Sequence, residues 1–227
     1  MAVFLALLIP TAWKARSDTA EKDVTRQKLS DLLRNRKLIG ACSVVSAYFV
    51  FIGAFESVWI LDMDHRGASQ WQIGVTVTCV ALPIAVLAPW GGSLAQRYGS
   101  RRWALAMITA CSIFNALFGL VPGLWALVFL TVGCGFAEGI GFPSGTMLVS
   151  SSVPESRQAA AQGLASAIEV GTAALAALGL AVVYTTVGHT VAYLVASGAM
   201  LVLLSVGWKL TIGIGGPESK MIESSAK

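Results

Sequence analysis

The sequence predicts an all-α, polytopic membrane protein, and three observations support this prediction. Its 227 residues are 56% hydrophobic and only 12% charged, which is unlike the composition of a soluble domain. Six long apolar segments are each able to cross about 30 Å of hydrocarbon. The basic residues gather in the polar stretches that would lie on a single side of a membrane.

The six predicted spans form one transmembrane bundle over residues 38–210. If Lys37 lies inside, fifteen of the sixteen Lys and Arg are cytoplasmic and only Arg66 is outside. This predicts a multi-pass protein of the cell membrane with both ends of the bundle in the cytoplasm. The tryptophans near span ends are expected at the headgroup level, Trp59 among them. The spans are 38–61, 71–95, 103–121, 123–149, 158–185 and 190–210.

The remaining residues lie at the two ends of the chain. Residues 1–13 are apolar but too short to cross a membrane alone, so we interpret them as a partial transmembrane helix. Residues 14–37 are rich in Lys and Arg and predict a cytoplasmic linker that ends in an amphipathic helix. Residues 211–227 are polar and predict a disordered cytoplasmic tail.

A short basic turn lies between the second and third spans, at residues 92–102. About seven residues connect the two spans, which requires a tight hairpin. We expect Gly92 and Gly99 to let the backbone turn, because glycine adopts conformations that other residues avoid. We expect Arg97, Arg101 and Arg102 to stay in water and to hold the turn on the cytoplasmic face.

This turn resembles the signature loop of the major facilitator superfamily of secondary transporters, written G-x-x-x-D-[RK]-x-G-[RK]-[RK]. Gln96 stands where the family has Asp, and Ser100 stands where it has the first of two basic residues. We therefore hypothesise a conformational loop motif at this turn. The residues that match the family pattern are Gly92, Arg97, Gly99 and Arg101.

The resemblance extends over residues 14–210 and implies the C-terminal six-helix half of such a transporter. The linker would be the central loop of the family, and residues 1–13 the remnant of a sixth helix. The chain is then expected to lack its N-terminal half or to pair with a second half-transporter. The family moves small solutes by alternating access driven by an ion or proton gradient, which implies a solute and protons as partners. We expect no nucleic-acid partner, because the basic residues do not interleave with aromatic residues on one soluble face.

Three glutamates lie inside predicted spans, where an ionised carboxylate is costly. Glu138 and Glu169 are near the midplane, and Glu56 is nearer the outside. One interpretation is that Glu138 or Glu169 takes up a proton and exchanges it against substrate. The other is a protonated carboxyl that only hydrogen-bonds a neighbouring helix. By the resemblance, all three lie on helices that line the central cavity.

Prolines and small residues modify the spans. Pro143 removes the donor to the carbonyl of Gly139, beside Glu138, and Pro83 and Pro89 do the same in the second span, so we expect helix kinks at all three. Packing alone also explains such kinks.

Small residues recur every four positions, which favours close helix packing. Two examples are Gly135 with Gly139, and Gly163 with Ala167 and Gly171.

Other kinds of chemistry find little support in the sequence. It contains no phosphate-binding glycine loop followed by Lys, no zinc-binding pair and no nucleophile with a matched base, so we expect no enzyme, cofactor or metal site. The charged run from Asp62 to Arg66 is interpreted as a solvated outer turn. The alternative to an efflux carrier or permease is a membrane-embedded structural or assembly partner that transports nothing.

Overall fold

A computed structural model describes residues 29–214. The chain divides into two units, Met1–Leu32 and Leu33–Lys227, and the first described helix is the short α2 (Leu29–Leu33). The predicted partial helix at residues 1–13, most of the linker and the tail from residue 215 lie outside the described residues. The domain limits given for them stay predictions.

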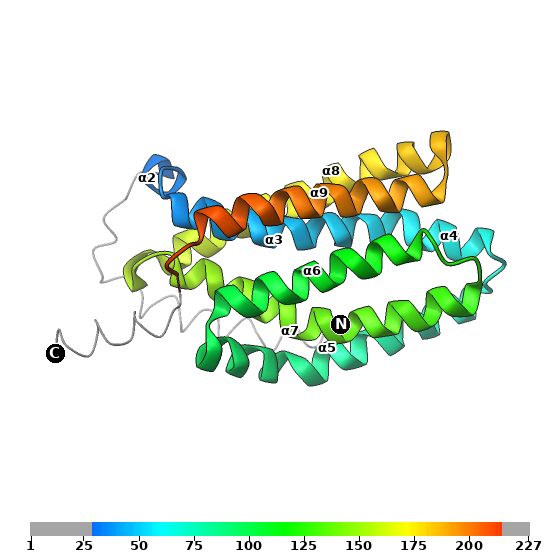
Figure 1. Ribbon diagram of the computed structural model, residues 1–227, viewed down its shortest axis with the longest axis horizontal. Coiled ribbons are helices and arrows are strands. Elements are labelled where there is room, and N and C mark those ends of the chain that lie inside the picture. The colour runs from blue at the N-terminus through cyan, green and yellow to red at the C-terminus, as the bar shows by residue number, and fades with distance from the viewer. Residues whose placement is uncertain (1–28, 215–227) are drawn as a thin grey trace, which may run out of the picture. The chain divides into compact units, whose positions relative to one another are not determined.

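Long helices make up the second unit, and the part of the chain that the structure describes contains no strand (Figure 1). The all-α class is thereby confirmed. A π-helical turn and a 3-10 turn interrupt the series. In order, the elements are α3 (Arg36–Ala54), η1 (Phe55–Trp59), α4 (Ile60–His65), α5 (Gln70–Tyr98), α6 (Ser100–Phe118), α7 (Leu124–Ser151), η2 (Glu155–Arg157), α8 (Gln158–Val187) and α9 (His189–Leu210).

Five of these segments are long and apolar enough to cross a membrane, and α6 is not among them. The five include the continuous segment Arg36–His65, which joins α3 to α4 through η1. α6 carries the third predicted span, but two arginines begin it and the polar Ser112 and Asn115 lie within it. Both polar side chains are buried and hydrogen-bonded to α9. The count of six spans therefore stays a prediction.

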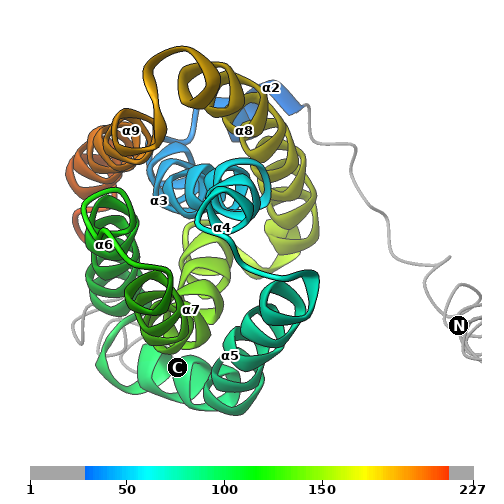
Figure 2. The ribbon, with the colours of Figure 1, turned by 90° about the vertical axis from the view of Figure 1, so that its right-hand side faces the viewer.

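The six long helices of the described residues form two groups of three in chain order, and the two groups pack in similar ways. α3 contacts α8 and α9, and α7 contacts α5 and α6 in the corresponding way. The end-on view shows α3 between α8 and α9, with α7 beside α5 and α6 (Figure 2). In chain order the two groups are α3, α5, α6 and α7, α8, α9. The first helix of each group thus contacts the second and third helices of the other group, which is the pattern that an inverted repeat produces.

Single glycines connect the second and third helices of each group. Gly99 (φ 98°) joins α5 to α6, and Gly188 (φ 111°) joins α8 to α9. Residues other than glycine rarely adopt these backbone angles. The predicted seven-residue connection is wrong, because α5 continues to Tyr98 and Gly92 lies inside the helix. Helical hydrogen bonding extends past the apolar residues that defined the predicted span.

Close approaches between helices occur where the packing helix carries glycine. A Cβ placed at Gly139 would lie 3.0 Å from the carbonyl oxygen of Pro83 on α5. A Cβ at Gly135 would lie 3.0 Å from the carbonyl oxygen of Val80, one turn earlier on α5. The predicted packing stripe of α7 therefore lies against α5, and this contact sets the position of the neighbouring Glu138.

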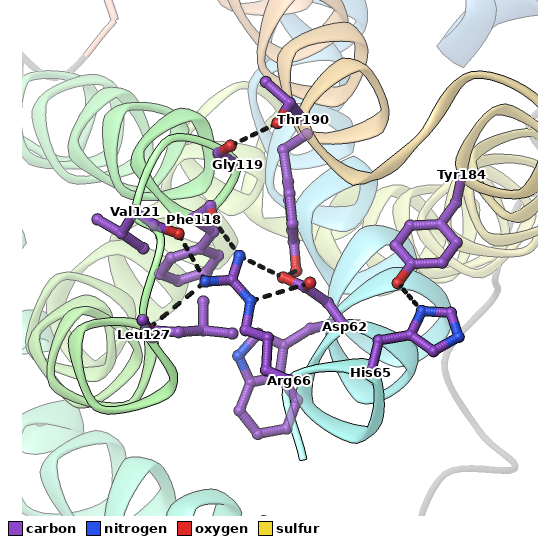
Figure 3. A network of polar contacts seen from close by, with 12 residues as sticks. Asp62, His65, Arg66, Phe118, Gly119, Val121, Leu127, Tyr184 and Thr190 are labelled. Atoms are coloured by element: carbon purple, nitrogen blue, oxygen red, sulfur yellow. Dashed lines mark hydrogen bonds and ion pairs between the residues drawn. The ribbon is translucent and has the colours of Figure 1, made fainter. Parts of the chain in front are cut away.

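An ion pair at the Arg66 end of the bundle is the clearest departure from the sequence prediction (Figure 3). Asp62 is buried, and Arg66 contacts it with two hydrogen bonds, Nε to Oδ1 at 3.0 Å and Nη2 to Oδ2 at 2.9 Å. The guanidinium also donates to the carbonyl oxygens of Phe118, the last residue of α6, and of Val121, three residues later. Arg66 thus satisfies carbonyls that a helix end leaves without partners.

Contacts from α8 and α9 complete this network. The Tyr193 hydroxyl donates to Asp62 Oδ2 at 3.3 Å, and Thr190 donates to the carbonyl oxygen of Gly119 at 2.8 Å. His65 Nδ1 lies 2.6 Å from the Tyr184 hydroxyl, and their rings stack. The interpretation of the Asp62 region as a solvated turn is wrong for Asp62 and Arg66, because their charges neutralise one another inside the protein.

We predict that Asp62→Asn destabilises the bundle by about 3 kcal/mol or more, because it leaves the nearly buried Arg66 charge without a counterion. Asp64→Asn is the matched control, since Asp64 is exposed two residues away. We expect its effect to stay within about 0.5 kcal/mol. Unfolding of the purified variants in mixed detergent, followed by circular dichroism, measures both. Equal stability of the two variants would contradict the structural role of the ion pair.

Candidate functional site

The midplane of the bundle contains a buried carboxyl paired with a phenol. Glu138, near the middle of α7, is 5% exposed, and Tyr48 of α3 is also buried. The Tyr48 hydroxyl donates to Glu138 Oε2 at 2.9 Å. Within residues 29–214, no Lys, Arg or His forms an ion pair with Glu138. A tyrosine hydroxyl can donate to a carboxyl with or without its proton, so the pair is satisfied in both states.

Aromatic rings and a thiol surround this pair. The Tyr48 ring lies 5.6 Å from the Phe142 ring, one turn after Glu138 on α7, and 5.6 Å from the Phe49 ring. Cys134, one turn before Glu138, is fully buried. The aromatic contacts fix the direction of the Tyr48 hydroxyl. Sequence reasoning missed Tyr48, although a tyrosine in the middle of an apolar span signals that its hydroxyl needs a partner.

Glu169 approaches α3 from a different helix. It lies on α8, is 8% exposed and is within electrostatic range of the Cys42 thiol of α3. It makes no hydrogen bond or ion pair within the described part of the chain. Cys42 and Tyr48 are six residues apart, which is about 9 Å along a helix. The structure therefore brings both predicted glutamates to α3, at different levels and without contact between them.

Glu56 occupies a distinctive backbone position. It is exposed and lies in the π-helical turn η1, and such turns are frequent at functional sites. Trp59 ends the same turn, is fully buried and donates from Nε1 to Thr131 Oγ1 on α7 at 2.9 Å. Trp59 thus faces α7 inside the bundle, and its expected depth at the headgroup level stays a prediction. Its indole holds η1 against α7 while Glu56 points away from the buried side.

The residues of the predicted loop motif lie at the junction of α5 and α6. Gln96, Arg97 and Arg102 are exposed, as expected for a basic turn. Arg101 is different, because it donates from Nε to Thr211 Oγ1 and from Nη2 to the Trp208 carbonyl oxygen, both at 3.0 Å. Arg101 is thus partly exposed and also bound to the protein. It connects the start of α6 to the end of α9.

The three span prolines lie within unbroken helices. α5 continues through Pro83 and Pro89, and α7 continues through Pro143. Near the last of these, Ser144 donates to the Ile140 carbonyl oxygen at 2.7 Å. The predicted kinks stay predictions. Within the described residues, no group of three His, Cys, Asp or Glu is placed to hold a metal ion.

Comparison with known proteins places this geometry in a family. The family model described as Major Facilitator Superfamily matches residues 38–220. Multidrug resistance protein MdtG of Dickeya zeae is 29% identical over 140 residues, which cover 60% of this chain and 34% of that protein. The probable sulfoacetate transporter SauU of Cupriavidus necator is 27% identical over 152 residues, 66% of this chain and 34% of that protein.

A third relative is the multi-drug resistance efflux pump PmrA of Streptococcus pneumoniae. It is 27% identical over 115 residues, which cover 48% of this chain and 29% of that protein. The chain spans about a third of the length of the curated relatives it matches. Because the family model covers most of the chain, this multi-pass membrane protein belongs to the major facilitator superfamily of transporters.

Proposed function

We propose that the chain is one six-helix half of a secondary transporter that moves a small solute by alternating access coupled to protons. Glu138 is the carboxyl that exchanges the proton. The supporting observation is its burial at the midplane with a neutral hydroxyl as its hydrogen-bond partner. Ionisable groups are costly within membrane spans and generally mark ion or proton pathways. Transport, rather than enzyme catalysis, is the activity that this arrangement favours.

The other two glutamates extend the proposed coupling site along one helix. Glu169 lies beside Cys42 at one level of α3, Tyr48 holds Glu138 at the next, and Glu56 follows in η1. Successive acids at different depths give a proton more than one acceptor as the cavity changes sides. We assign Glu169 and Glu56 to this pathway and keep Glu138 as its central group.

The names of the relatives favour efflux of small organic molecules. Two of them are multidrug resistance proteins or pumps, and one is a probable sulfoacetate transporter. We also propose that the bundle lies in the cell membrane with its basic end in the cytoplasm. Three basic residues are exposed at that end: Arg97, Arg102 and Lys209. At the other end, Arg66 is neutralised by its ion pair with Asp62.

A structural or assembly role is the second candidate, and one observation favours it. The hydrogen bond between Tyr48 and Glu138 joins α3 to α7, which is what a purely structural carboxyl would do. A glutamine at position 138 would keep an acceptor for the Tyr48 hydroxyl but carry no exchangeable proton. The Glu138→Gln variant therefore separates the two functions.

We predict that Glu138→Gln lowers solute flux driven by a pH gradient by about 100-fold, because a positioned proton carrier typically contributes about that factor. The control is Glu155→Gln, which removes an exposed carboxyl at η2. Membrane vesicles from cells that express the gene in its natural context are assayed with ethidium and with sulfoacetate. Unchanged flux and pH dependence in Glu138→Gln, with normal membrane insertion, would support the structural role instead.

We further propose that α8 faces the other half of the transporter. Its buried residues form one narrow stripe that includes Ala161, Ala165 and Glu169. Gly163 and Gly171, on another side of the helix, have nothing within 4 Å of a Cβ placed on them. The small-residue stripe of α8 that includes Gly163 and Gly171 therefore does not pack against another described helix of the bundle. A smooth stripe allows a second helix to approach closely, which lipid chains do not require.

We predict that a spin label at Gly171 is shielded from oxygen dissolved in the bilayer, whereas a label at Val202 is accessible. Val202 of α9 is 62% exposed and serves as the reference position. The labels are attached to single cysteines in a Cys79→Ser background, since the other three cysteines are buried. Electron paramagnetic resonance in native membranes measures the collision rates. Equal oxygen accessibility at both positions would contradict a partner on this face.

A further inference from the structure

A groove between α6 and α9 ends beside the basic turn at Gly99. Its volume is about 480 Å³. Leu105 and Ala106 form the α6 side, and Leu201 and Leu204 form the α9 side. Most of the lining is therefore apolar, as a hydrocarbon chain would require. At its end near the turn the groove is lined by Arg102 and Trp208.

The charges at this end of the groove are not balanced. Arg101 already has partners at the end of α9. It donates hydrogen bonds to Thr211 and to the Trp208 carbonyl oxygen, and its guanidinium lies 4.6 Å from the centre of the Trp208 ring. Arg102 is exposed and has no hydrogen bond or ion pair within residues 29–214. No Asp or Glu is among the described residues that line the groove. Burial, and secondarily the charge of Arg102, lower the pKa of Arg101.

The N-terminus of α6 also favours binding of an anion at this end of the groove. The cap residue Gly99 provides no side-chain hydrogen bond to the first turn, and the first turn contains no acidic residue. Helix starts carry partial positive charge and free backbone N–H groups, which favour negative ligands. Two arginines in this first turn add to that charge. An anionic group next to Arg102 would therefore be stabilised by both the helix and the side chain.

We propose that this groove binds an anionic phospholipid of the cytoplasmic leaflet. One acyl chain lies along Leu105, Ala106 and Leu201, and the phosphate lies at Arg102 beside the start of α6. Trp208 is 56% exposed and lies at the level where indole rings meet headgroups. Basic pockets between membrane helices on this side suit such headgroups. The proposal depends on the membrane orientation given above but not on transport.

The test titrates the full chain in detergent micelles with phosphatidylglycerol or phosphatidylcholine of the same acyl chains, and native mass spectrometry counts bound lipid. We expect one tight site for phosphatidylglycerol. Arg102→Ala weakens it about fivefold, the contribution of one basic residue near a charged headgroup. The matched control Arg97→Ala removes an exposed charge of the same turn outside the groove and changes binding less than twofold.

A second variant tests the acyl-chain part of the site. Ala106→Trp fills the groove from an exposed position and keeps Arg102, so bound phosphatidylglycerol is expected to fall as strongly as in Arg102→Ala. Three results would overturn the proposal: equal losses in Arg97→Ala and Arg102→Ala, no effect of Ala106→Trp, or displacement of the lipid by inorganic phosphate. Each of these experiments measures lipid binding, so a negative result would count against the lipid site and not against the proposed solute transport.

Discussion

A polar group placed among apolar membrane helices has to find its partner within the protein, and α3 with its continuation supplies many of these partners. Tyr48 pairs with Glu138, Trp59 with Thr131, and Asp62 with Arg66. Among the described residues, no side-chain nitrogen or oxygen that is fully shielded from solvent lacks a hydrogen bond. A polar group left without a hydrogen bond in hydrocarbon would raise the free energy of the folded protein by several kcal/mol. This constraint explains why α3 lies among helices from both groups of three.

Both ends of α6 are held by arginine, and this makes the bundle a coherent unit. Arg66 binds carbonyls at and just after the end of α6, and Arg101 joins the start of α6 to the end of α9. Gly99 and Gly188 allow only one-residue connections, which leave little freedom between the helices they join. Alternating access by rocking of one half against another requires this kind of internally fixed unit. The open stripe of α8 leaves a smooth surface for such a contact.

The sequence was sufficient to locate the helices and the buried acids, but it did not identify their partners. Long apolar runs predicted α5, α7, α8 and α9 to within a few residues, because hydrocarbon thickness sets helix length. Glu138 and Glu169 stood out for the same reason. Tyr48 and the buried Asp62 and Arg66 were missed, since pairing depends on how each helix is rotated about its axis. Hydropathy carries no information on that rotation.

The central claim is that the Glu138 carboxyl holds an exchangeable proton under the control of Tyr48. Infrared difference spectroscopy of the protein in lipid bilayers, recorded between acidic and alkaline pH, tests it most directly. The account predicts a carboxyl C=O band that disappears in Glu138→Gln and shifts in frequency in Tyr48→Phe, where the hydrogen bond is lost. A difference spectrum that is identical in the unmodified protein and in Glu138→Gln would contradict it.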